Sequence, residues 1–140
     1  MRPVEDFNQR VIAEFRAGGG TVGGTFAGAP LLLLHSVGAR SGEARVNPVM
    51  YMPDGERFIV FASKGGAPTN PDWYHNLRSH PDASVEVGSD SVAVTATEVT
   101  GPERDTLFRR HADRYPGFDE YQAKTSRVIP VVALTPKPKP

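Results

Sequence analysis

Short apolar segments separated by tight turns make up most of this chain after residue 30. Each segment is rich in β-branched, aromatic or leucine residues and is bounded by glycine, proline or polar turn residues, which is typical of short strands. Because most connections suit hairpins, the pattern favours an antiparallel barrel over a βαβ fold. We therefore expect an α+β fold, a small barrel with helices packed on it. The predicted strands span residues 31–37, 45–52, 58–62, 83–87, 91–99 and 128–134.

Three stretches carry apolar residues at helical spacing, which predicts an N-terminal helix and two further helices. They span residues 4–17, 71–80 and 102–114. In the second, Asn70 is a typical N-cap and Pro71 fits the first helical position. No repeat or linker divides the chain, so we expect one domain over residues 1–140. Its outer parts are a helix and glycine-rich crossing in residues 1–30 and a tail in residues 136–140.

Charge and cysteine content narrow the function classes. Sixteen basic residues balance sixteen acidic ones, so no net field draws the chain to nucleic acid or an anionic membrane. The absence of cysteine excludes disulfides and thiolate chemistry. The four histidines lack metal-ligand spacing, so we expect no metal site and interpret His35 as buried and neutral. No signal peptide or run of transmembrane length is present, so a cytoplasmic protein is expected.

The stretch SKGGAPTNPDWYHNL, residues 63–77, follows a predicted buried strand. Ser63 and Lys64 end that strand, and the two glycines after them leave the backbone open to a ligand. A hydroxyl, an ammonium group and a helix start therefore converge at one strand end, where a polar, planar ligand would fit. The alternative is a structural loop and helix in which Trp73 belongs to the core.

A second informative stretch is GARSGEARVNP, residues 38–48. Arg40 lies in a glycine-flanked turn and Arg45 begins the next predicted strand. Two guanidinium groups, the Ser41 hydroxyl and free backbone N–H groups near one turn can bind a phosphate. The alternative is a solvated hairpin turn with two surface arginines.

These two stretches, together with RYPGFDEYQAKTSRVIPVV at residues 114–132, resemble the deazaflavin-dependent nitroreductase family. Members are split β-barrel oxidoreductases that use coenzyme F420, a deazaflavin whose tail carries phosphate and glutamates. The resemblance covers roughly residues 31–135. It implies an FMN-binding split-barrel-like fold and hydride transfer from reduced F420 to a quinone, an activated alkene or enone, or a nitroaromatic compound.

The resemblance also implies site residues. The basic turn at residues 38–42 and Arg45 would hold the tail of F420. Residues 47–50 and 61–64, from two strands, would line its ring system. The helix start at residues 72–76 would close over the tail and the ribityl chain. Tyr115, Phe118 and Tyr121 would roof the substrate pocket, with Ser63, Tyr115 or Tyr121 as the catalytic hydroxyl; the alternative is aromatic core. The implied cofactor-binding residues are Ala39, Arg40, Ser41, Arg45, Val46, Asn47, Pro48, Val49, Met50, Phe61, Ala62, Ser63, Lys64, Asp72, Trp73, Tyr74, His75, Asn76 and Phe118.

Three positions depart from the family's pattern. Ala39 replaces an arginine found in many members, so tail binding would depend more on Arg40 and Arg45. Phe118 stands where some relatives have a tyrosine, and Met50 where some have an aromatic residue. These changes affect the substrate more than the cofactor.

Several alternatives remain open from the sequence. One is an FMN-dependent reductase of the same fold, and another is a non-catalytic protein that binds or stores F420. We expect a small-molecule acceptor and a monomer or homodimer. If the acceptor is a lipid quinone, the amphipathic helix over residues 4–17 is the candidate for peripheral membrane contact, with core packing as the alternative.

Overall fold

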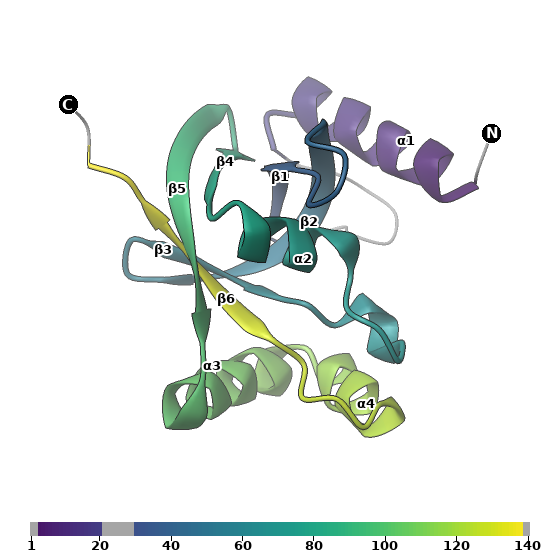
Figure 1. The fold of residues 1–140 in the computed structure, drawn as a ribbon, viewed down its shortest axis with the longest axis vertical. Coiled ribbons are helices and arrows are strands. Elements are labelled where there is room, and N and C mark those ends of the chain that lie inside the picture. Colours follow the sequence, from purple (N-terminus) through teal and green to yellow (C-terminus); the bar gives the residue numbers. More distant parts are fainter. Residues whose placement is uncertain (1–2, 21–29, 139–140) are drawn as a thin grey trace.

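The fold is a closed antiparallel barrel with helices on its outside (Figure 1), seen in a computed structural model that describes residues 3–20 and 30–138. The strands follow the order β1-β2-β3-β6-β5-β4 around the barrel. This confirms the predicted barrel. The strands are β1 (Leu31–Val37), β2 (Ala44–Asp54), β3 (Arg57–Phe61), β4 (Asp82–Val87), β5 (Asp90–Val99) and β6 (Val131–Pro136).

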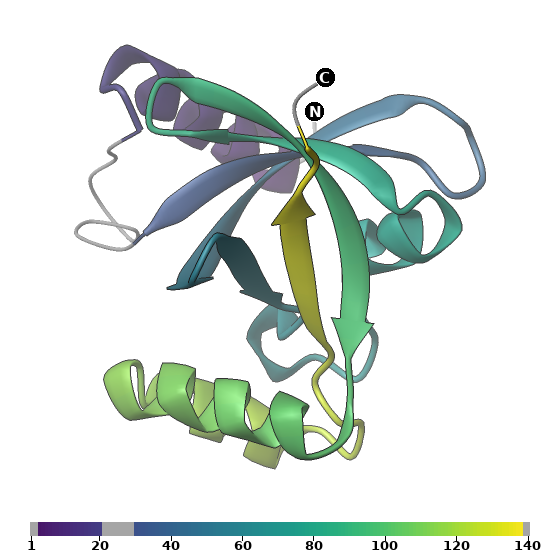
Figure 2. The same cartoon turned by 90° about the vertical axis from the view of Figure 1, so that its left-hand side faces the viewer.

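Helices cover different sides of this barrel. Figure 2 shows α3 and α4 side by side beneath it, while α1 lies at the opposite end. A 3₁₀ turn, η2 (Lys64–Gly66), follows β3. None of the helices in the described part of the chain is long and apolar enough to cross a membrane. The helices are α1 (Pro3–Ala17), α2 (Asp72–Ser79), α3 (Gly101–Arg114) and α4 (Gly117–Lys124).

The alternation of side chains along the strands builds the core in layers. In β1, Leu32 and Leu34 point into the barrel, whereas Leu31 and Leu33 point outward, as the two-residue period of a strand requires. The outward pair packs against Val11, Ile12 and Phe15 of α1. These three residues of α1 are thus buried on the barrel, as the core-packing alternative for this helix predicts.

His35 departs from the prediction of a buried, neutral residue. Its side chain is 36% exposed, and its Nε2 lies 2.5 Å from Oε2 of Glu86. The same carboxylate pairs with Arg16 of α1. The prediction of burial was wrong because His35 continues the outward side of β1 beyond the two leucines that α1 covers.

Three differences from the predictions bear on the site. The α2 helix begins at Asp72 without a side-chain cap, because Asn70 Oδ1 instead accepts a hydrogen bond from Arg127 Nη1 at 2.8 Å. Residues 117–124 form α4, a helix that the sequence analysis left out. Strand β6 starts at residue 131 rather than 128, since Pro130 has no N–H for the ladder.

Candidate active site

Glycines at two positions shape the turn between β1 and β2. Gly42 has a φ of +72°, and a Cβ at Gly38 would lie 2.5 Å from the Ser41 Oγ. The turn is closed by the Gly38 N–H, which donates to the Glu43 carbonyl at 2.8 Å. Arg40 is exposed within this turn, and Arg45 follows it on β2 with a side chain that is 52% exposed.

The side chain of Asn76 in α2 holds this turn in place. Its side chain is buried, and its Oδ1 accepts a hydrogen bond from the Ala39 N–H at 2.9 Å. Its amide nitrogen lies 3.5 Å from the Ser36 Oγ. A buried amide that bridges strand and turn holds the two arginines in a defined place relative to α2.

The other side of the site is η2, where three successive residues have a left-handed backbone. Lys64, Gly65 and Gly66 have φ values of +47°, +62° and +82°. For the non-glycine Lys64 this conformation costs about 1–2 kcal/mol, so other contacts must maintain it. The Lys64 Nζ donates to the Thr69 Oγ1 at 3.2 Å.

Between the basic turn, η2 and α2 lies a cavity of about 680 Å³, which we call the tail cavity. Three cationic side chains and one carboxylate, that of Asp72, line it. It brings together many of the predicted binding residues and adds Gly38, Thr69 and Asn70, which the sequence analysis did not propose. The full lining is Gly38, Ala39, Arg40, Ser41, Arg45, Asn47, Lys64, Thr69, Asn70, Asp72, His75 and Asn76.

The remaining predicted binding residues lie outside the tail cavity. Trp73, Tyr74, Val49 and Ala62 belong to the core inside the barrel. The Tyr74 hydroxyl donates to Glu98 at 2.7 Å, and burial raises the pKa of this tyrosine.

Three more predicted residues lie on the outward side of β2 and therefore do not reach the cavity. Val46 and Met50 pack with the core under α1, and Pro48 pairs with the outward-facing Leu33 of β1. Ser63 is half-buried between β3 and η2.

Phe61, Tyr115, Phe118 and Tyr121 gather around His111 in what we call the aromatic cluster. The His111 ring stacks on Phe61 with centroids 4.1 Å apart, and Phe118 meets it edge-on at 4.3 Å. The side chain is 1% exposed, and its Nε2 has no hydrogen-bond partner in residues 3–20 and 30–138. Burial lowers the pKa of His111 to about 4, so the ring is neutral at pH 7.

The tail cavity and the aromatic cluster meet at η2. A Cβ on Gly66 would lie 2.7 Å from the Tyr121 carbonyl oxygen, so η2 rests directly on the backbone of α4. Only three positions of chain separate Phe61 of the cluster from Lys64 of the cavity.

Comparison with known proteins decides the family. The family model for F420H(2)-dependent quinone reductase matches residues 8–136. The chain belongs to this family. An F420H(2)-dependent quinone reductase of Mycobacterium tuberculosis is 40% identical over 130 residues, which cover 88% of this chain and 85% of the relative.

Solved structures agree with the family assignment. A structure of an F420-H2 dependent reductase is 38% identical with a TM-score of 0.69, and the match covers 75% of this chain and 93% of the other. A second structure, described as a domain-swapped dimer, is 34% identical with a TM-score of 0.70, covering 94% of this chain and 96% of the other.

Membership confirms the predicted deazaflavin-dependent family and its split-barrel fold. As a member of the F420H(2)-dependent quinone reductase family, the protein is an oxidoreductase, and its cofactor is coenzyme F420. The donor set of the tail cavity fits that cofactor, because two guanidinium groups and an ammonium group can meet the phosphate and glutamates of its tail.

Proposed function

We propose that the tail cavity holds the anionic tail of F420, that the deazaflavin ring lies at the end of β3, and that the enzyme reduces a quinone. The observation that carries this proposal is the meeting of Arg40, Arg45 and Lys64 at one cavity with a single acidic lining residue. Because the whole chain has no net charge, only such a local cluster can attract a polyanionic tail.

Each side of the cavity has a separate task. Arg40 and Arg45 offer planar, bidentate donors that match phosphate and carboxylate oxygens. Lys64 supplies a point charge from the opposite side of the cavity. Two acidic groups oppose an anion: Asp72 lines the cavity near the helix start, and Glu43 lies 3.4 Å from Arg45 at the turn.

The ring is proposed to lie against the end of β3. Because Phe61 and Ala62 are buried, they would contribute their backbone and the shape of the wall, whereas half-buried Ser63 can offer its hydroxyl. Asn47 lines the cavity on the neighbouring strand β2. Of the residues predicted to line the ring, Asn47 and Ser63 are therefore the two whose side chains we propose to reach it.

Reduced F420 supplies the hydride in this family. A quinone that accepts a hydride develops negative charge on its carbonyl oxygen and then takes up a proton. We propose that Ser63, Tyr115 or Tyr121 donates a hydrogen bond to that oxygen, which stabilises the charge as it develops. A tyrosine of the aromatic cluster would deliver the proton. The quinone is proposed because the curated relative is named a quinone reductase.

Titration of the purified chain with F420 and with FMN, followed by quenching of cofactor fluorescence, tests the cofactor site. We expect F420 to bind more tightly, because FMN has a single phosphate and lacks the glutamate tail. Rapid mixing of the enzyme, reduced F420 and a soluble benzoquinone should then restore the oxidised cofactor's visible band. Tight binding without quinone-dependent reoxidation would contradict the proposed acceptor.

We further propose that the chain forms a homodimer, since the 34% identical structure is described as a domain-swapped dimer. Light scattering of the purified chain during gel filtration should give twice the mass of 15.2 kDa. A single peak at the monomer mass across a wide concentration range would reject this proposal.

A further inference from the structure

Arg127 makes the densest set of polar contacts to the segment that carries Lys64. Arg127 lies in residues 125–130, a connection between α4 and β6 that we call the strap. Its Nε donates to the Ala67 carbonyl at 3.0 Å, and its Nη2 donates to the Ser63 carbonyl at 2.7 Å. Its Nη1 donates to the Ala62 carbonyl at 2.9 Å and to Asn70 Oδ1 at 2.8 Å.

These four acceptors span residues 62–70 and bracket η2. Ser63 and Ala67 flank the three left-handed residues on either side, so Arg127 clamps both ends of that turn. Lys64 and Asn70 line the tail cavity from this same segment. Three of the four acceptors are backbone carbonyls, and the Ser63 carbonyl also accepts from the Gly66 N–H at 2.9 Å. Breaking the clamp therefore removes a donor from three backbone carbonyls and one side chain at once.

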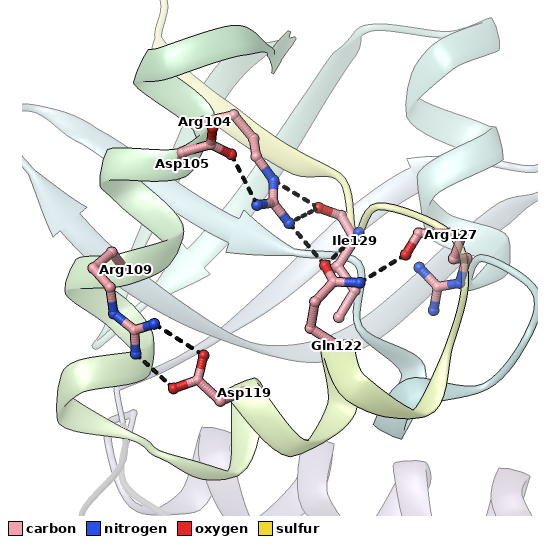
Figure 3. Close-up of polar contacts among 7 residues, drawn as sticks. All are labelled: Arg104, Asp105, Arg109, Asp119, Gln122, Arg127 and Ile129. Atoms are coloured by element: carbon pink, nitrogen blue, oxygen red, sulfur yellow. Dashed lines mark hydrogen bonds and ion pairs between the residues drawn. The ribbon is translucent and has the colours of Figure 1, made fainter.

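The strap is itself fixed to the helices beneath it (Figure 3). Gln122 of α4 donates to the Arg127 carbonyl at 2.7 Å and accepts from the Ile129 N–H at 3.0 Å. Arg104 of α3 donates from Nη2 to the Ile129 carbonyl at 2.9 Å and to Gln122 Oε1 at 3.0 Å. These hydrogen bonds fix the backbone of Arg127. Its guanidinium group in turn holds residues 62–70 through the four hydrogen bonds described above.

We propose that Arg127 is a positioning residue of the F420 site. It holds residues 62–70 in the conformation that presents Lys64 to the cofactor tail and Ser63 to the ring, and it maintains the strained backbone at Lys64. The proposal rests on the proposed function, because it assigns the tail to the cavity that Lys64 lines. It adds a residue that lies outside the cavity and that no sequence motif assigned to the site.

The test uses Arg127→Met, which removes all the donors, and Arg127→Lys, which keeps the charge with fewer donors. Arg104→Met is the matched control, because Arg104 holds the strap but makes no hydrogen bond to residues 62–70. The first readout needs no cofactor. Limited trypsin digestion, with products identified by mass, gives the rate of cleavage after Lys64 relative to cleavage after Arg78 in α2.

We expect Arg127→Met to raise this cleavage ratio about tenfold, because the segment opens locally while α2 stays folded. We expect Arg104→Met, which loosens the strap but keeps the four Arg127 hydrogen bonds to residues 62–70, to raise the ratio much less than Arg127→Met does. Arg127→Lys should give an intermediate ratio. The second readout is F420 binding by fluorescence, which should weaken about tenfold in Arg127→Met. The KM for reduced F420 should rise in parallel, while the KM for benzoquinone changes little.

Two results would overturn the proposal. One is an unchanged Lys64 cleavage ratio in both Arg127 variants. The other is a raised ratio with unchanged F420 affinity, which would mean that the clamped conformation does not serve the cofactor. If even the wild-type chain failed to bind F420, the proposed function would fall, and the cleavage ratio would still decide whether Arg127 holds residues 62–70. Should Arg127→Met not fold, Arg127→Lys gives the same pair of readouts.

Discussion

The tail cavity and the aromatic cluster meet at η2 and are built in opposite ways. The cavity is polar and open, and two of its charged side chains, those of Arg40 and Lys64, come from turns that contain glycines with positive φ. The cluster is apolar and largely buried, and β3, α3 and α4 supply its rings. Under the proposed function, the difference implies that charge recognition by the cavity and shielding of the reacting centre by the cluster are separate tasks. Each can therefore be damaged without the other.

The largest effect is expected at the cavity. In Arg40→Ala/Arg45→Ala, F420 affinity should fall at least about 100-fold, because each charge-assisted hydrogen bond contributes about 1.5–3 kcal/mol. The KM for a benzoquinone should stay nearly constant if the acceptor uses the cluster. Arg110→Ala is the control, since Arg110 pairs with Asp54 away from the cavity. Equal losses for F420 and quinone would contradict the separation.

The next largest effect is expected at η2, where the cavity and the aromatic cluster meet. Gly66→Ala should lower the free energy of unfolding by about 3 kcal/mol, because the added Cβ meets the α4 backbone and φ is positive. Gly65→Ala is the matched control: its φ is also positive, but its Cβ would meet nothing within 4 Å, so only about 1 kcal/mol is expected. Urea unfolding measures both. Similar losses in the two variants would mean that η2 does not depend on its contact with α4.

His111 makes the contribution of the aromatic cluster to stability depend on pH. Its pKa in the folded chain is about 4, below the 6.5 of an exposed histidine. The unfolded chain therefore binds more protons between these values, and stability should fall as pH drops from 6.5 toward 4, by up to on the order of 3 kcal/mol. Above pH 6.5 this contribution is fully present.

The control for this prediction is His111→Phe, which keeps a ring on Phe61 and removes the titrating group. Its free energy of unfolding should be nearly flat between pH 6.5 and 5 in urea titrations. Glu86, whose pKa Arg16 lowers to about 2, adds its own slope only at more acidic pH. A slope in the variant equal to that of the wild type would place the acid sensitivity elsewhere.

The smallest effect concerns chemistry at the cluster. Tyr121→Phe removes one hydroxyl from a partly buried ring that packs on Phe118. We expect the kcat for quinone reduction to fall about tenfold, equivalent to 1.4 kcal/mol, with F420 affinity unchanged. Tyr115→Phe, measured alongside, shows which hydroxyl matters. Parallel losses of turnover and F420 affinity would mean that Tyr121 only builds the pocket.

The barrel could be predicted because its strands carry their own signals. Strand β1 has the predicted bounds, since its leucine run is buried on both sides, inside the barrel and under α1. Helix α4 was missed because Phe118 and Tyr121 are its only large apolar residues, too few for a clear helical period. Long-range contacts could not be predicted either. Asn70 does not cap α2, because its Oδ1 accepts a hydrogen bond from Arg127, which is 57 positions away in the sequence.

The candidate site also has parts that local sequence signals predict and parts that depend on long-range packing. The basic turn was predictable, because glycines on both sides of Arg40 indicate a tight turn. The position of Trp73 was not, since the packing of α2 decides which of its faces enters the barrel core and which meets the cavity. The place of His111 among the rings was not predictable either, because it depends on how α3 packs on β3.

The most direct test compares F420 with its tail-less deazaflavin chromophore on the wild-type chain and on Arg40→Ala/Arg45→Ala, with all four dissociation constants measured by fluorescence titration. If the cavity binds the tail, the wild type should prefer F420 strongly, and the double variant should lose most of that preference while binding the chromophore as before. If the two ligands bind the wild type equally, or if the variant keeps the full preference, the tail is not held by these arginines.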